Sequence, residues 1–243
     1  MSAVSRFGHV GLAALAFLLL MYTCAPAANA ATVFSVSGPN TSDALSTTIL
    51  IQSSHLGFGV EFTTATNYSN VSFSVTLADT LGVPSTVGLE VFLTSQIGPG
   101  TTSSSEIASA TPTVNVVNGG TSAPYNLSQV DILSLPFLPA GTYYLTFDAT
   151  SVSDGSPKIV ESLDAQRIVA TLPGVTVDPT LDTGGPASYL PASGFGHLDG
   201  VSSWFAMTGD PASVPEPSTL LISLSGIAVV VGASRRKGLN RKG

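Results

Sequence analysis

Apolar and polar residues alternate with a period of two through much of the middle of the chain. The clearest case is the segment 71–77, in which Val, Phe, Val and Leu alternate with Ser, Ser and Thr. This alternation is typical of a strand with one buried face, and long apolar repeats of helical period are missing. The pattern predicts strands at residues 33–36, 48–51, 58–62, 71–77, 89–93, 113–117, 143–147, 168–172 and 204–208.

Turn-forming residues separate these apolar runs. Examples are Gly98-Pro99-Gly100, Asn118-Gly119-Gly120 and Gly184-Gly185-Pro186, which favour turns over regular structure. About ten short strands at this spacing predict an all-β fold, an antiparallel β-sandwich or jelly roll. Residues 177–200 are rich in Pro and Gly, so we expect a long loop there.

The first thirty residues have the pattern of a secretion signal. Arg6 gives the segment a positive start, residues 10–22 are apolar, and Ala28-Asn29-Ala30 places small residues where a signal peptidase cuts. We therefore expect a signal helix over residues 1–30 that is removed by cleavage before Ala31.

Cys24 is the single cysteine of the chain, so cleavage before Ala31 leaves a protein without disulfides, a thiol nucleophile or Cys-ligated zinc. The exported fold must then be held by its core alone. Two alternatives are acylation at Cys24, which the bulky Tyr22 disfavours, and a retained membrane helix, for which the apolar core is short.

The last thirty residues combine three features in a fixed order. Val214-Pro215-Glu216-Pro217 is stiff and extended, because proline fixes its own φ and biases the residue before it. Residues 218–234 carry no charge and form, as a helix, a segment of about 25 Å, the low end of what spans a bilayer. Arg235, Arg236 and Lys237 then open a basic end, residues 235–243, that should stay on the cytoplasmic side.

This order of features resembles the PEP-CTERM sorting tail of Gram-negative bacteria, over residues 214–243. The resemblance implies recognition by an exosortase, a membrane-embedded enzyme similar to cysteine peptidases, and cleavage near Pro215-Glu216-Pro217. It implies a C-terminal transmembrane helix that holds the protein in the inner membrane before processing. The protein would then join the cell surface or the extracellular polysaccharide. The alternative is an ordinary single-span anchor.

Residues 31–213 have the length of one domain with a substantial core. Lys158 and Arg167 are its only fixed cations against fourteen Asp and Glu residues, which gives a net charge of −12. Nucleic-acid binding is excluded, because it needs basic surface to neutralise phosphates. An acidic surface suits solubility near anionic polymers, or calcium, and solubility is the simpler explanation.

Two short stretches of this domain carry a second resemblance. The sequences at 59–63 and 138–145 resemble the choice-of-anchor β-sandwich domains, which occur with several alternative surface anchors. The resemblance covers residues 45–210 and implies a β-sandwich. That family has no established catalytic residues to carry over.

Motifs for catalysis are missing from the sequence. There is no Gly-x-Ser-x-Gly elbow, no His-Glu-x-x-His helix and no phosphate-binding Gly-Lys-Ser/Thr. The domain keeps two histidines, His55 and His197, for which exposed loop positions are the simplest explanation. A glycosidase would need paired carboxylates, and surface positions are the ordinary explanation for such residues on strands. The candidates on or near predicted strands are Glu61, Glu90, Asp148 and Glu161.

Aromatic residues and loop carboxylates give two further candidates. Trp204 is expected to pack in the core, whereas Tyr143 and Tyr144 should point to opposite faces, one of them a platform for a sugar. The expected loop carries Asp178, Asp182 and Asp199, which are candidate ligands for calcium, although their spacing matches no EF-hand.

These observations favour an exported, non-catalytic surface or extracellular-matrix protein that is associated with exopolysaccharide. A carbohydrate-binding module and a secreted hydrolase are the two alternatives. Apart from calcium, no cofactor is expected.

Overall fold

The computed structural model describes residues 30–40, 45–49, 57–79, 84–98, 101–153, 157–163, 166–183, 195–197 and 201–212. The chain divides into two compact units, Met1–Asp210 and Pro211–Gly243. The predicted signal peptide, sorting motif and C-terminal apolar run lie outside the described residues, so they stay predictions. Among the described residues, no helix is long and apolar enough to cross a membrane.

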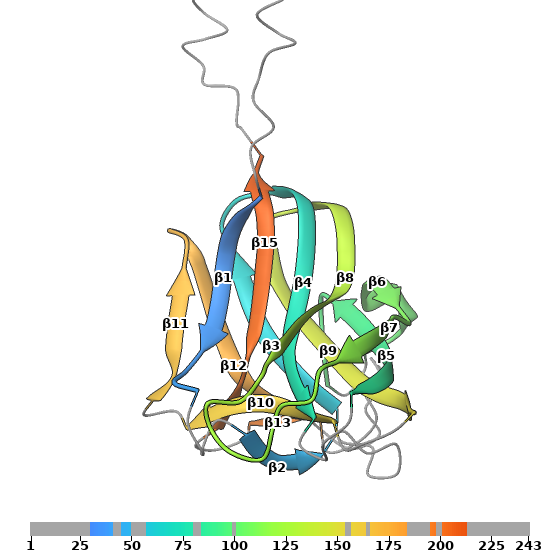
Figure 1. Cartoon of the computed structure of the whole chain (residues 1–243). Coiled ribbons are helices and arrows are strands. Elements are labelled where there is room, and N and C mark those ends of the chain that lie inside the picture. The colour runs from blue at the N-terminus through green and yellow to red at the C-terminus, as the bar shows by residue number, and fades with distance from the viewer. Residues whose placement is uncertain are drawn as a thin grey trace, which may run out of the picture. The chain divides into compact units, whose positions relative to one another are not determined.

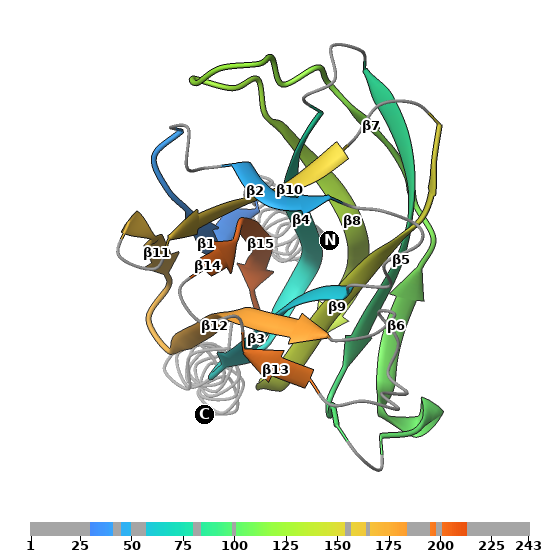
Figure 2. The ribbon, with the colours of Figure 1, turned by 90° about the horizontal axis from the view of Figure 1, so that it is seen from below.

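The predicted all-β class is confirmed, because the described residues form two antiparallel β-sheets (Figures 1 and 2). Each of the nine predicted segments overlaps a strand, but the described strands number fifteen rather than about ten. Their bounds are β1 Ala31–Ser37, β2 Leu45–Ile49, β3 Gly57–Thr64, β4 Tyr68–Asp79, β5 Ser85–Thr94, β6 Glu106–Ala110, β7 Thr113–Val116, β8 Ser128–Leu138, β9 Gly141–Val152, β10 Pro157–Leu163, β11 Ile168–Thr171, β12 Val175–Thr183, β13 Phe195–His197, β14 Val201–Ser203 and β15 Phe205–Pro211, with a 3-10 turn at Ser103–Ser105.

The eight-stranded sheet has the order β11-β1-β15-β4-β10-β14, with β8 paired to β4 and β2 paired to β10. Figure 1 shows its strands β11, β1, β15, β4 and β8 side by side. The seven-stranded sheet has the order β13-β12-β3-β9-β5-β6, with β7 paired to β5. Consecutive strands such as β3 and β4, or β8 and β9, belong to opposite sheets, as in a β-sandwich of jelly-roll type.

Phe62 joins the two sheets at the centre of the core. Its ring centroid lies 5.2 Å from that of Phe34 on β1, 5.5 Å from that of Phe73 on β4 and 5.5 Å from that of Tyr143 on β9. Tilted aromatic pairs at this spacing add about 0.5–1.5 kcal/mol each beyond the burial of their surface. The alternating aromatic positions therefore supply the cohesion of a domain whose only cysteine precedes the first strand.

The long loop expected at residues 177–200 is only partly correct, because β12 continues through its first part and β13 lies within it. Asp178 and Asp182 are therefore strand residues rather than loop residues. Pro179 suggested a loop because proline cannot donate to a sheet ladder. In the structure it is buried, and the register between β12 and β3 shifts between Asp178 and Leu181, which accommodates it.

The first and last strands of the domain lie next to each other. β1 pairs antiparallel with β15, and Ala31 lies opposite Gly209 whereas Ser35 lies opposite Ala206. Ala31 and Asp210 are consequently at one end of the sheet, and Ser37 and Phe205 are at the other end. The predicted mature N-terminus thus coincides with the start of β1.

Candidate functional site

Three of the four predicted carboxylates lie on the outer face of the seven-stranded sheet. Glu61 on β3 alternates with the buried Val60 and Phe62, so its side chain points away from the core. Glu90 on β5 is directly opposite Asp148 on β9 in the strand register. Glu161 is on β10, in the other sheet. The fold therefore brings Glu90 and Asp148 together and keeps Glu161 apart.

The two adjacent tyrosines point to opposite faces of β9, as predicted. Tyr143 is buried, and its hydroxyl donates a hydrogen bond of 2.7 Å to the Pro139 carbonyl. Burial raises the pKa of Tyr143 above its ordinary value. Gly141 leaves room beside it, because a Cβ there would lie 3.0 Å from the Tyr143 hydroxyl oxygen, a tight contact. The short sequence at 138–145 is therefore a turn closed by its own tyrosine.

Tyr144 is half-buried on the outer face and lies opposite Glu61 in the register of β3 and β9. Its pKa is raised, first by burial and then by the negative charge of Glu61. A cavity of about 130 Å³ opens near Glu61, lined by Glu61, Phe62, Thr63, Thr176, Val177 and Asp178. Neither Glu90 nor Asp148 lines it, so the neighbouring carboxylates and this cavity do not form one cleft.

The three predicted calcium ligands are not gathered in the described part of the chain. Asp178 lines the small cavity opposite Glu61, and Asp182 follows on β12 beyond the register shift. Asp199 lies outside the described residues. Among the described residues, no group of three or more His, Cys, Asp and Glu is placed to hold a metal ion. Calcium binding stays a prediction.

His197 ends β13, and His55 lies outside the described residues.

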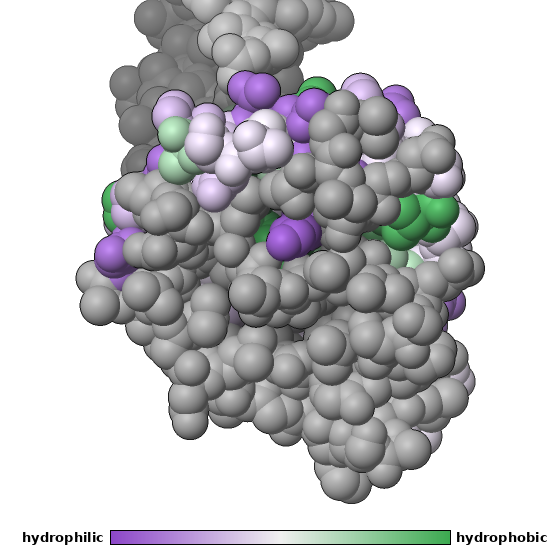
Figure 3. Space-filling view, turned by 60° about the horizontal axis from the view of Figure 1, so that its bottom comes forward, coloured by the Kyte–Doolittle hydropathy of each residue, from purple (hydrophilic) through white to green (hydrophobic). Residues whose placement is uncertain are grey.

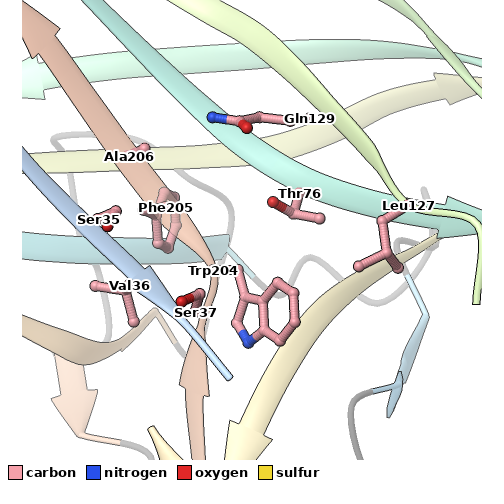
Figure 4. A pocket seen from close by; sticks show the side chains of 9 residues that line it. All are labelled: Ser35, Val36, Ser37, Thr76, Leu127, Gln129, Trp204, Phe205 and Ala206. Atoms are coloured by element: carbon pink, nitrogen blue, oxygen red, sulfur yellow. The ribbon is translucent and has the colours of Figure 1, made fainter. Parts of the chain in front are cut away.

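A larger cavity, of about 340 Å³, lies on the outer face of the eight-stranded sheet. We call it the Trp204 pocket (Figure 4). Its residues come from β1, β4, β8 and β15 and from the junctions beside them, all near the end of the sheet that is opposite Ala31. The described lining residues are Ser35, Val36, Ser37, Thr76, Leu127, Gln129, Trp204, Phe205 and Ala206.

Trp204 occupies the single-residue junction between β14 and β15. Its backbone N–H donates to the Val160 carbonyl at 2.9 Å, and its carbonyl accepts from the Thr76 N–H at 3.0 Å. These bonds hold the junction against β10 and β4. Its side chain packs with Ala78, Val160 and Leu127 in a cluster of its own and is only 7% exposed.

The predicted burial of Trp204 is thus confirmed, with a difference that the sequence did not reveal. It packs outside the main aromatic core, and part of the indole borders the pocket. The apolar residues that follow it in the sequence, Phe205, Ala206 and Met207, predicted only that it would be buried. Nothing in the local sequence indicates that Ser37, Thr76 and Gln129 meet it from three other strands.

The loop 117–127, between β7 and β8, contributes its last residue, Leu127, to the pocket. A backbone hydrogen bond closes the base of the loop, where the Asn126 N–H donates to the Gly119 carbonyl at 2.9 Å. Next to this base, the loop is tied to the segment after β1, because the Asn40 side-chain amide donates to the Tyr125 carbonyl at 2.7 Å and accepts from the Tyr125 N–H at 2.9 Å. Figure 1 shows the loop crossing the outer side of the sheet.

The chemistry of the Trp204 pocket is polar but uncharged. Ser35, Ser37 and Thr76 bring hydroxyl groups, and Gln129 brings an amide whose nitrogen donates to the Ser74 hydroxyl at 2.8 Å. The Trp204 indole and Leu127 add apolar surface. Hydroxyl and amide groups beside an aromatic ring suit a ligand that has many hydroxyl groups and apolar C–H faces.

Comparison with known proteins identifies no family. No family model matches the sequence, and no curated protein matches it. Among solved structures, the chain is similar to Xyl-CBM35 in complex with a glucuronic acid containing disaccharide, at 15% identity over 63% of this chain and 93% of that chain, with a TM-score of 0.30.

It is also similar to a family 35 carbohydrate-binding module from an environmental isolate, at 19% identity over 60% of this chain and 91% of that chain, with a TM-score of 0.31. A third is CBM35 from Cellvibrio japonicus Abf62, at 15% identity, 63% and 93% coverage and a TM-score of 0.30.

Proposed function

We propose that this chain is an exported, non-catalytic protein of the cell surface or extracellular matrix that binds carbohydrate in the Trp204 pocket. The observation that carries this proposal is the set of hydroxyl and amide side chains gathered beside the Trp204 indole. A volume of about 340 Å³ is near the lower end of small-molecule sites, which are about 300–1,000 Å³, and suits a short stretch of a glycan.

The rest of the surface supports a protein that works in water beside polysaccharide. On the face shown in Figure 3, the described residues are a mixture of hydrophilic and near-neutral ones, with apolar residues in small areas. The domain is acidic, and its predicted export and sorting would deliver it to the exopolysaccharide. In this proposal, signal peptidase and exosortase are processing partners, and the polysaccharide is the lasting one.

The proposal can be tested by filling the pocket. Ala206 lies in it and is half-buried, so Ala206→Leu adds bulk there without removing a polar group. Affinity electrophoresis of the full chain through soluble polysaccharides should show retardation. The variant should bind at least about ten-fold more weakly, a loss of about 1.4 kcal/mol.

The matched control is Ser109→Leu, at an exposed position on β6 of the other sheet, which should bind as the unchanged protein does. If the unchanged protein binds no glycan at millimolar concentration, carbohydrate binding is wrong. The simpler role of a matrix protein without a ligand would then remain.

The neighbouring carboxylates Glu90 and Asp148 favour a second candidate, a secreted hydrolase. Asp148 is buried, and its Oδ1 accepts a hydrogen bond of 2.7 Å from the Ala149 N–H, so it is engaged by its own strand. Release of reducing sugar from a bound polysaccharide, lost in Glu90→Gln, would support this candidate over a non-catalytic protein.

A further inference from the structure

We propose that strand β11 pairs with β11 of a second copy of this chain, so that the eight-stranded sheets of two copies join edge to edge. The observation behind it is that β11 is an edge strand whose four residues are all exposed and uncharged. Figures 1 and 2 show it at the border of the eight-stranded sheet. The pairing does not depend on the proposed carbohydrate binding, but its consequence for the ligand rests on that proposed function.

The backbone of β11 offers hydrogen-bonding groups on the side away from β1. Within the described residues, β11 pairs with β1 alone. The N–H of Leu172, just after β11, donates to the Val33 carbonyl at 2.9 Å, and residues that bond to a neighbouring strand alternate with residues that do not. Ala170 therefore bonds to β1, whereas the N–H and C=O groups of Val169 and Thr171 point to the other side. A strand of another polypeptide chain complements such a row of donors and acceptors.

Two other edge strands carry features that discourage pairing with another chain. β8 contains Asp131 and Pro136, β6 begins with Glu106, and the register of each with its neighbour shifts at one point. Charges, prolines and bulges of this kind protect edge strands. β11 has none of them, its register with β1 is regular, and Ile168 and Val169 are 58% and 39% exposed. β11 is therefore open to pairing in a way that β6 and β8 are not.

A second copy fits this edge because its own β11 has the same unpaired groups. Antiparallel pairing centred on Ala170 places Val169 of each copy opposite Thr171 of the other, so the outward groups of both residues bond in both copies. Residues 168–177 carry no charge, so the contact brings no like charges together although each domain has a net charge of −12. A two-fold contact covers both free edges and closes, whereas a strand from a different protein would cover only one.

The pairing also determines where the two Trp204 pockets face. Ile168 and Ala170 lie opposite the pocket residues Ser37 and Ser35, so they share the outer face of the sheet with the pocket. The two-fold axis of an antiparallel strand pair is perpendicular to the sheet, which leaves the outer faces of both copies on one side. The two β1 strands would be about 14 Å apart, three spacings of about 4.8 Å. Two pockets could then bind one polysaccharide chain.

The test uses the position that pairs with itself. Ala170 is exposed and would face Ala170 of the second copy in a non-hydrogen-bonded pair, with Cα atoms about 4.5 Å apart. Association of full chains with two different fluorescent labels is measured by energy transfer in mild detergent, at about 0.15 M salt. Unchanged chains should associate. Two Ala170→Glu chains, or two Ala170→Lys chains, should associate about five-fold more weakly, because like charges then face each other. Mixing Ala170→Glu with Ala170→Lys should restore association.

Two controls separate pairing through β11 from other contacts. Val169→Pro removes an outward N–H and keeps the bonds to β1, and edge strands accept proline at such positions, so it should abolish association. Ser109→Glu, at an exposed position on β6 of the other sheet, should not affect association. All arms carry the same residues 214–243, so equal association in every pair would place the contact elsewhere and overturn the proposal. No association of unchanged chains, or no recovery in the mixed pair, would also overturn it.

A second measurement separates this inference from the proposed function. Binding is measured to dextran, pullulan and mannan and to trisaccharides of the same sugars. Ala170→Glu should bind a long polymer more weakly than the unchanged chain but a trisaccharide equally, because only the polymer can reach two pockets. Equal binding of the polymers by both chains would overturn the bivalent consequence. If unchanged chains associate as expected but bind none of these glycans, the pairing stands and carbohydrate binding is wrong.

Discussion

At the scale of single residues, Tyr143 shows how one side chain closes the turn before β9. Its hydroxyl donates to the Pro139 carbonyl at 2.7 Å, and Gly141 leaves room for its ring. Tyr143→Phe removes that donor and leaves the Pro139 carbonyl without this bond. We expect the free energy of unfolding to fall by about 0.5–1.5 kcal/mol, measured by urea denaturation of the purified full chain.

The adjacent tyrosine gives the control for this prediction. Tyr144→Phe removes the same atom from the half-buried outer position, and we expect a change within about 0.5 kcal/mol. Equal losses in the two variants would show that the turn does not depend on the Tyr143 hydroxyl.

At the scale of elements, the Asn40 amide links the segment after β1 to the loop 117–127 through two hydrogen bonds to Tyr125. Asn40→Ala removes both bonds but leaves the base of the loop closed by Asn126 and Gly119. We expect faster amide hydrogen exchange that is confined to the loop. The free energy of unfolding should fall by about 1–2 kcal/mol at most.

Asn40→Asp keeps the acceptor for the Tyr125 N–H and should give an intermediate exchange rate. If Asn40→Ala instead raises exchange throughout β1 and β15, the amide supports the sheet rather than the loop.

Strands could be predicted where apolar and polar residues alternate strictly along the sequence. β4 and β5 have one face in the core and one face toward solvent, so their sequences alternate and were predicted. β6 was missed because Glu106-Ile107-Ala108-Ser109-Ala110 has no fully buried position and little apolar contrast. β12 was missed because Pro179 cannot donate to a sheet ladder and so indicated a loop. In the structure the strand continues past this proline through a shift of register.

The pocket could be predicted even less well than the strands. Trp204 was recognised as a residue to be buried, and it is. Ser37, Thr76 and Gln129 are small polar residues on the outer sides of ordinary strands, with no motif around them. They meet only because β1, β15, β4 and β8 are neighbours in the sheet, and this order is set by the packing of the whole core.

At the scale of the whole molecule, delivery depends on residues 214–243, whose function remains a prediction from sequence. Replacing Pro215, Glu216 and Pro217 by alanines should leave the protein uncut in the inner membrane of the producing bacterium. The reason is that the stiff, extended segment required for recognition is lost. The measurement is immunoblotting of membrane and surface fractions.

The matched control keeps the prolines and changes a nearby position, Ser213→Ala, which should be processed normally. An unchanged mature size and location in the triple-alanine variant would show that the tail is an ordinary membrane anchor.

The pairing of β1 with β15 also determines how the domain would respond to mechanical force. A ligand in the Trp204 pocket contacts the start of β15, and any attachment through the C-terminal tail acts on the end of the same strand. The same ligand also contacts the neighbouring strands β1 and β4, so tension between the ligand and the tail would shear β15 against these two strands. Their hydrogen bonds run across the direction of pulling, so many of them would have to break together rather than one after another. A fold without disulfides would in this way resist shear between the cell and its surrounding polymer.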